Sequence, residues 1–337
     1  MGYKACRYSN VLTMKHISYV IILILLAVAC AKQPPQAREE VRLHFFPTPD
    51  VRSASPPEDA VDDVNIFIFG PGGTAEEHIW ARGKDLKGGS VKASLVKGVP
   101  YTFYVCANTG YRMQEASAKE LEEMRYFLTY PDEFSRGIPM SAVHRNIPAD
   151  DVIDLQLTRC MAKLELRMDR SKLYSGVNID IESIEVGACP RSVQLFGESK
   201  ARSTDDLFPK GYIRSGVQAG PLNTDEKEGM SQPLCLYLLE NCQGTLLEGA
   251  TGPEDKVFGS LDKTGELCSY VELHASYRSS RYCNRPGEYL IYRFYLGESL
   301  NNFDVHRNVN YNIIIRPEGS GLNEDSWRVD RNALEPT

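Results

Sequence analysis

Residues 152–168 read VIDLQLTRCMAKLELRM and carry the clearest secondary-structure signal in the chain. Apolar and polar side chains alternate on both sides of Arg159, which is the period of a strand lying half-buried on a sheet. The pattern therefore predicts two strands in direct succession. Its first half rests on Val152, Leu155 and Leu157, and its second half on Met161, Leu164 and Leu166.

Comparable runs occur along most of the chain, with loops of varied length between them. Val64–Phe69 is a dense run of β-branched and aromatic residues that ends in the turn sequence GPGG at 70–73. Many short strands separated by turn signals are typical of antiparallel β-sandwiches. The other strands are expected at residues 41–46, 90–96, 99–106, 177–186, 192–196, 234–239, 269–277, 289–296 and 309–315.

One segment has the composition of a helix. Residues 114–128 (QEASAKELEEMRYFL) combine strong helix formers with apolar side chains for packing. Residues 47–62 contain four prolines and no periodicity, so we expect a loop there. The long polar stretch 198–230 is expected to form an exposed excursion. The sequence predicts an all-β fold with one helix inserted in its N-terminal part.

The length of the chain indicates two domains. About 308 residues follow the N-terminal apolar segment, which is more than one hydrophobic core usually serves. We place the boundary between Thr158 and Arg159, where the two successive strands meet. The prediction is a first antiparallel β-sandwich over residues 41–158 and a second over 159–337.

The N-terminus has the organisation of a bacterial lipoprotein signal peptide. Three basic residues and no acidic one precede an apolar run of about 13 residues, which is too short to span a bilayer. The run ends in the small residues Ala27-Val28-Ala29, followed directly by Cys30. We expect residues 1–29 to be removed and Cys30 to carry lipid, including palmitate. Met14 is an alternative start, because a signal beginning there would also be complete.

Charge and composition limit what the exported chain can bind. Removal of residues 1–29 takes away three positive charges and changes the formal net charge from −7 to −10. An acidic chain without a basic stripe does not suit nucleic-acid binding. Residues 30–40 are polar and contain proline, as expected of a tether that holds a lipid-anchored domain away from the bilayer. Ala31 gives no inner-membrane retention signal, so we expect the outer membrane.

Seven of the nine cysteines remain after Cys6 and Cys30 are assigned to the signal and the lipid, so at least one thiol is free. Pairing of Cys283 with either Cys268 or Cys242 is open. Other cysteines lie on apolar faces of predicted strands, where cysteine behaves as a small hydrophobic residue. These are Cys106, Cys160 and Cys235.

No local motif for catalysis or metal binding is present. The sequence has no CxxC pair and no HExxH, GxSxG or SxxK motif, and its histidines are isolated. We expect His274 and His306 to be surface or rim residues rather than ligands. The prediction is a protein without catalytic residues, metal ligands or a cofactor. A glycosidase-type carboxylate pair stays open, because such pairs meet only in the folded chain.

Several segments together resemble one known family. They occur in a characteristic order after the lipobox, and the resemblance runs from about residue 41 to 329. The segments are VDDVNIFIFGPGG (61–73), VPYTFYVCANTG (99–110), LTRCMAKLEL (157–166), QPLCLYLLENCQG (232–244) and NFDVHRNVNYNIII (302–315). This pattern is similar to the fimbrillin-associated anchor lipoproteins of Bacteroidetes.

The resemblance implies two tandem transthyretin-like β-sandwich domains and a lipidated Cys30. It further implies an outer-membrane protein that holds a fimbrium at the cell surface, helps to set its length and joins fimbrial subunits by strand-level assembly. No enzymatic activity is implied. The alternatives are a tip or accessory fimbrial subunit and a surface protein that binds glycans or another ligand. Two tryptophans are few for sugar platforms, although 18 tyrosines are present.

Two structural expectations concern assembly and the first core. Val41–Phe46 is expected to be an edge strand, because a proline-rich loop separates it from the next strand, and Ser326–Asp330 is a second candidate for pairing. In Val64–Phe69, Ile66 and Ile68 should face the core and Asn65 the opposite side. We therefore expect Ile66→Ala to destabilise the fold far more than Asn65→Ala.

Overall fold

The structure is a computed structural model, and it describes nine stretches of the chain. These are residues 37–47, 58–86, 88–128, 137–197, 211–251, 255–256, 263–282, 289–322 and 327–334. The predicted signal peptide, Cys30 and most of the predicted tether lie outside these residues, as does Cys283. In the described part, no helix has the length and apolar character needed to cross a membrane.

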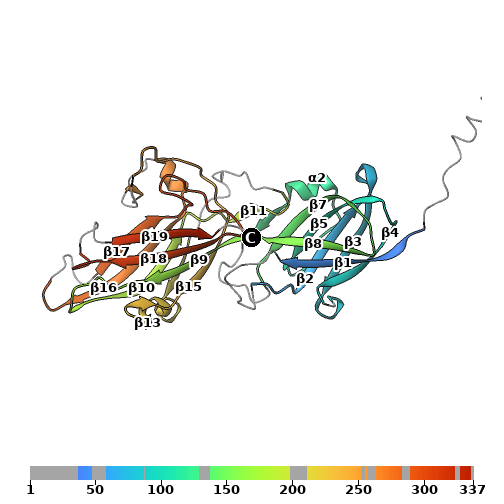
Figure 1. Ribbon diagram of the computed structural model, residues 1–337. Coiled ribbons are helices and arrows are strands. Elements are labelled where there is room, and N and C mark those ends of the chain that lie inside the picture. The colour runs from blue at the N-terminus through green and yellow to red at the C-terminus, as the bar shows by residue number, and fades with distance from the viewer. Residues whose placement is uncertain are drawn as a thin grey trace, which may run out of the picture.

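The N-terminal half forms one seven-stranded sheet that folds back on itself (Figure 1). Strands β7 and β8 pair only at Met140–Arg159 and Ser141–Thr158. The two halves of the sheet are therefore hydrogen-bonded to each other at the start of β7 and the end of β8 and separate along the rest of these strands. Its order is β3 (Ala75–Arg82), β2 (Asp63–Phe69), β5 (Pro100–Ala107), β7 (Met140–Pro148), β8 (Val152–Arg159), β1 (Glu39–Pro47) and β4 (Ser90–Leu95).

Alternating apolar residues of these strands fill the space between the two halves of the folded sheet. Leu43 from β1, Ile66 from β2 and Leu155 from β8 are among them, and all three are fully buried. We call this cluster the first core. It is composed of residues from Val41 to Leu157, which is within the span predicted for the first sandwich.

The C-terminal half contains two four-stranded sheets (Figure 1). One has the order β15 (Leu234–Leu239), β9 (Met161–Met168), β18 (Asn310–Pro317) and β19 (Trp327–Leu334). The other has the order β12 (Tyr212–Ser215), β10 (Val177–Gly187), β16 (Tyr270–Ser279) and β17 (Tyr289–Tyr295).

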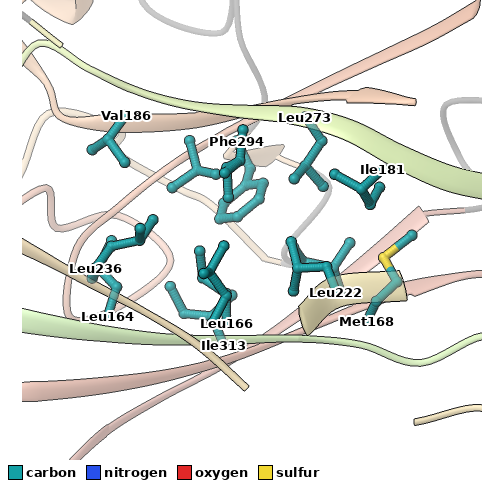
Figure 2. Packing of buried hydrophobic residues seen from close by; sticks show 14 of the residues in the cluster. Leu164, Leu166, Met168, Ile181, Val186, Leu222, Leu236, Leu273, Phe294 and Ile313 are labelled. Carbon is teal, nitrogen blue, oxygen red and sulfur yellow. The ribbon is translucent and has the colours of Figure 1, made fainter. Parts of the chain in front are cut away.

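Between these sheets lies a second core, which extends from Ala162 to Ile315. Figure 2 shows how Leu164 and Leu166 of β9 and Ile313 of β18 point toward Leu273 of β16 and Phe294 of β17. Facing sheets that each bury one side are the arrangement of a β-sandwich. The all-β prediction is confirmed.

Strands β8 and β9 are the two successive strands predicted at 152–168. Only Cys160 separates them, and the chain passes there from the first core to the second. Two pairings depart from the predicted antiparallel pattern, because β1 runs parallel to β8 and β18 runs parallel to β9. Each of the two successive strands thus has one parallel neighbour.

The predicted helix is much shorter than 114–128. Helix α2 covers only Ala118–Glu123, where Ser117 and Glu120 form a capping box. The chain then becomes strand β6 (Arg125–Phe127), which pairs with β11 (Ser192–Gln194). Pairing with a distant strand therefore outweighs the helical propensity of the local sequence.

The described part of 198–230 is not a plain exposed excursion. It contains β12 and the short strand β13 (Asp225–Lys227), which pairs with β14 (Met230–Ser231). Ala219 and Leu222 are fully buried in the second core. The polar composition gave no sign of these two buried residues, whereas the other residues of 211–230 are exposed or half-buried, as expected.

Both faces of β2 are buried. The expectation that Asn65 is at a tolerant position on the outer side of the strand therefore needs correction. Ile66 and Ile68 belong to the first core, as predicted. Phe67 and Phe69 pack on the other side against Tyr104, in a third group of side chains that we call the junction cluster. The junction cluster also contains Leu121 of α2, Met161 of β9 and Leu239 of β15. Asn65 is fully buried as well.

Candidate assembly edges and polar clusters

Strand β1 is an interior strand, so the prediction of an edge at Val41–Phe46 is wrong. It pairs with β4 on one side and with β8 on the other, with six residue pairs in each ladder. Val41 and Leu43 are fully buried. The proline-rich loop separates β1 from β2 in sequence, but a long connection does not prevent a strand from inserting elsewhere in the sheet.

The described part of the C-terminal candidate, Trp327–Asp330, lies at a sheet edge, and Ser326 is outside the described residues. Strand β19 pairs with β18 along eight residue pairs, from Trp327 opposite Pro317 to Leu334 opposite Asn310. Within the described residues it has no sheet neighbour on its other side. One row of backbone hydrogen-bonding groups is therefore available for an added strand.

In the part of the chain that the structure describes, strand β17 lies at the edge of its sheet and carries exposed apolar side chains. Tyr289 is 63% exposed and Ile291 is 65% exposed, and both lie on the outer face of the sheet. At the opposite edge, Ile213 of β12 is 60% exposed. Large apolar residues on an edge strand favour pairing with another chain. The alternating pattern of residues 289–296 predicts a strand from the sequence, but only the sheet order shows that β17 lies at an edge.

A polar cluster ties the segment before β2 to the second half of the molecule. The Glu58 carboxylate lies 2.9 Å from the Lys163 ammonium of β9, and both side chains are less than 9% exposed. Tyr237 of β15 donates a hydrogen bond to the same carboxylate. Arg159 pairs with Asp59 and lies 3.1 Å from the amide oxygen of Asn308.

Burial raises the pKa of Tyr237, and the neighbouring Glu58 raises it further. The ion pairs and hydrogen bonds of this cluster connect residues 58–59 to the strands that lead into the second core. Sequence reasoning missed it, because Glu58 and Asp59 precede their partners by 100 residues or more and no local pattern links them.

Among the described residues, Cys106, Cys160, Cys189, Cys235 and Cys242 are free thiols. Cys106, Cys160, Cys189 and Cys268 are buried, and Cys235 and Cys242 are partly exposed. The expectation of buried small hydrophobic residues is confirmed for Cys106 and Cys160, whereas Cys235 is only half-buried. Burial raises the pKa of the Cys106 thiol well above its ordinary value. The pairing considered for Cys283 lies outside the described residues.

Folding brings one predicted rim histidine, His306, next to two potential ligands. Its Nδ1 atom lies 3.4 Å from the Cys242 thiol and 3.7 Å from a carboxylate oxygen of Glu240. Hydrogen bonds to Cys242 and Glu240 raise the pKa of His306 to about 10. Burial raises the pKa of Glu240, but the interactions of this carboxylate with His306 and Arg307 lower it by more. The pKa of Glu240 is therefore below its ordinary value.

The Cys242–His306 pair does not have the electrostatics of a nucleophile. Burial raises the pKa of the Cys242 thiol, whereas reactive cysteines have a depressed pKa. One hint is present in the sequence, because Glu240 and Cys242 are two residues apart. His306 is 64 residues away, and no sequence pattern links it to them.

A second histidine cluster lies on the outer face of the β10–β16–β17 sheet. His274 Nε2 is 2.7 Å from a Glu272 oxygen, and Glu185 lies close to both. The other oxygen of Glu272 pairs with Arg293. This cluster resembles an ordinary cross-strand ion-pair network.

Comparison with solved structures finds the same fold in fimbrial and adhesion proteins. The tip fimbrial protein Mfa3 of Porphyromonas gingivalis, C-terminally truncated, superposes with a TM-score of 0.58 at 13% identity. The comparison covers 88% of this chain and all of that one. A putative cell adhesion protein of Bacteroides eggerthii gives a TM-score of 0.56 at 11% identity, with 90% and 98% covered.

A fimbrillin of Porphyromonas gingivalis gives a TM-score of 0.51 at 12% identity, covering 88% of this chain and 97% of that chain. No curated protein matches the sequence. A family model described as a domain of unknown function (DUF4906) matches residues 236–315, which is less than a quarter of the chain. At these identities the likeness concerns the fold: the chain folds as these fimbrial and cell-adhesion proteins do.

Proposed function

We propose that this protein is a fimbrial lipoprotein that anchors a fimbrium to the outer membrane through lipid on Cys30 and helps to set the length of the fibre. The observation that carries the proposal is the extent of the fold similarity. It covers both cores and nearly the whole of a tip fimbrial protein and a fimbrillin. The predicted signal peptide of residues 1–29, with Cys30 directly after it, supports a membrane attachment at the N-terminal end.

Assembly with a fimbrial subunit would use sheet edges. Among the described residues, strands β17 and β19 each leave one side of their sheets open, and β17 also exposes Tyr289 and Ile291. A strand of a partner subunit can add to such an edge through backbone hydrogen bonds, while its side chains contact the exposed apolar residues. The division into domains at residues 158 and 159 is part of this proposal, with the first domain next to the membrane.

The proposal involves no turnover of a substrate. The one cysteine–histidine pair described above has a thiol pKa above its ordinary value, which is the opposite of nucleophile activation. The structural relatives are named as fimbrial and adhesion proteins rather than enzymes.

A second candidate is a tip or accessory subunit, which is favoured by the similarity to a tip fimbrial protein. Deletion of the gene followed by electron microscopy separates the two. An anchor predicts fibres that are shed or abnormally long, whereas a tip subunit predicts attached fibres of ordinary length. Immunogold labelling should place an anchor at the base of the fibre.

The membrane attachment is tested by Cys30→Ala. We expect loss of labelled palmitate and release of the protein from the outer-membrane fraction. Unchanged labelling would refute lipidation at Cys30. Purified protein that associates with no fimbrial subunit from the same cells, and instead binds a soluble glycan, would replace the fimbrial proposal by the glycan-binding alternative.

A further inference from the structure

The cluster of Glu240, Cys242 and His306 is held by the backbone. Asn241 and Val305 form an isolated antiparallel bridge in which each N–H donates to the other carbonyl at 2.9 Å. Residues next to a bridged pair project to the opposite side of the strands from that pair. Glu240 and Cys242 flank one end of the bridge and His306 flanks the other, so all three side chains emerge on the same face.

The distances between the three ligand atoms suit a small tetrahedral ion. The Cys242 Sγ and His306 Nδ1 atoms are 3.4 Å apart, and His306 Nδ1 and Glu240 Oε1 are 3.7 Å apart. In a tetrahedral zinc site, with bonds of about 2.3 Å to sulfur and about 2.0–2.1 Å to nitrogen, ligand atoms lie about 3.3–3.6 Å from one another. The third pair, the Cys242 thiol and the Glu240 carboxylate, lies within 4.8 Å.

Outer groups hold two of these ligands in the orientation that metal sites use. The other ring nitrogen of His306 lies 3.5 Å from the Glu298 carboxylate, an arrangement that selects Nδ1 as the free ligand atom. Arg307 Nε donates to Oε2 of Glu240 at 3.0 Å, and the backbone N–H of Arg307 donates to Oε1 at 3.4 Å, the oxygen that faces His306. Such carboxylate–histidine and hydrogen-bonded carboxylate pairs are a regular feature of zinc sites.

We propose that Glu240, Cys242 and His306 bind one zinc ion, with a water molecule at the fourth position. Zinc binding displaces the thiol proton of Cys242 and the proton on Nδ1 of His306 into the solvent. The resulting thiolate and imidazole, with the Glu240 carboxylate, form a donor set that suits zinc, and the two anionic ligands balance its charge. The half-exposed side of His306 gives the ion access from solvent. The site would fasten the segment after β15 to the segment before β18, a role separate from fimbrial anchoring.

The second histidine cluster does not have these features. It contains no thiol, and the two oxygens of Glu272 are already engaged by His274 and Arg293. A metal there would have to displace the arginine. The proposal is therefore confined to the Cys242 cluster.

The test uses the full chain, purified in detergent, reduced and stripped with a chelator. Cobalt(II) is the probe. We expect one equivalent to bind, with a thiolate-to-cobalt charge-transfer band and the visible bands of a tetrahedral site, and stoichiometric zinc should displace it. Cys242→Ser should abolish the charge-transfer band, and Glu298→Gln should weaken binding by about 10–100-fold. Cys235→Ser is the matched control and should change nothing.

A second measurement does not depend on variants that fold. In the wild-type protein, zinc should protect Cys242 from alkylation at least tenfold while Cys235 stays reactive, as read by peptide mass spectrometry. Absence of cobalt binding, survival of the charge-transfer band in Cys242→Ser, or equal alkylation of Cys242 with and without zinc would each overturn the proposal.

Discussion

Lys163 and Glu58 form a buried ion pair between two segments that are 105 positions apart in the sequence. Removal of one partner leaves an unpaired charge in the interior, which typically destabilises a fold by about 3–5 kcal/mol. We expect Lys163→Met to lower the free energy of unfolding by an amount in this range, measured by urea denaturation.

The exposed pair Lys92–Glu40 is the matched control, because its side chains are 68% and 65% exposed. Lys92→Met should change the free energy of unfolding by less than about 1 kcal/mol. Equal effects of the two lysine substitutions would show that Glu58 and Lys163 are not held together in solution.

Asn65 is a second position at which burial determines how much a substitution destabilises the fold. Its amide nitrogen donates to Thr109 and to the Tyr111 carbonyl, and its oxygen accepts from the Met113 N–H at 2.9 Å. Asn65→Ala would leave the buried Met113 N–H unpaired, at a cost of about 1–3 kcal/mol. Ile66→Ala should cost about 2–5 kcal/mol through the cavity that it creates.

Thermal unfolding of the two variants measures this comparison. Both melting temperatures should fall clearly below that of the wild-type protein. A melting temperature of Asn65→Ala equal to that of the wild type would mean that the face of β2 toward the junction cluster is open to water.

At the scale of elements, β1 and β17 should respond oppositely to substitution. Leu43 lies in the middle of β1, paired with Val91 on one side and Ile153 on the other. Leu43→Pro removes a ladder donor from an interior strand and should prevent folding, seen as loss of soluble protein. Ile291→Lys places a charge on the edge strand β17, where it should change stability by only about 0.5 kcal/mol.

The same Ile291→Lys variant should bind fimbrial subunits more weakly, because charges on an edge oppose strand addition. A pull-down with cell extract and electron microscopy of the complemented deletion strain measure this loss. Subunit retention equal to that of the wild type would exclude the β17 edge as the assembly surface.

Elements with regular alternation could be predicted from the sequence, and those without it could not. β8, β9, β10 and β15 were predicted to within one or two residues, because their apolar residues recur at every second position. β3 (AEEHIWAR) and β7 (MSAVHRNIP) were missed, since they are too polar or lack a regular period. The parallel neighbours of β8 and β9 could not be predicted, because register and strand order depend on long-range pairing.

The candidate sites were even less predictable. The zinc ligands come together through a single bridge between Asn241 and Val305, and the sequence contains no local trace of that contact. The C-terminal candidate was predicted as Ser326–Asp330, and β19 lies at a sheet edge among the described residues. The N-terminal edge was not found where expected, because connection length does not determine where a strand inserts.

At the scale of the whole molecule, the two cores are coupled rather than independent. Cys160 is the single residue between β8 and β9, and the junction cluster packs Phe67 and Tyr104 against Met161 and Leu239. We expect both cores to unfold in one transition. Tryptophan fluorescence and far-ultraviolet circular dichroism should give coincident denaturation curves. Two separated transitions would show that the junction cluster does not couple the cores.

The parallel pairing of β1 with β8 has a mechanical consequence under the proposed attachment. Tension on the membrane tether enters at the start of β1 and pulls that strand along its own axis. The six residue pairs to β4 and the six to β8 are then loaded in shear, all at once, instead of being peeled apart one by one. From β8 the load passes through the covalent chain at Cys160 into β9, and its parallel neighbour β18 is sheared in the same way. A fibre under flow would thus strain whole ladders of hydrogen bonds together, and the protein would resist extraction more strongly than its equilibrium stability alone suggests.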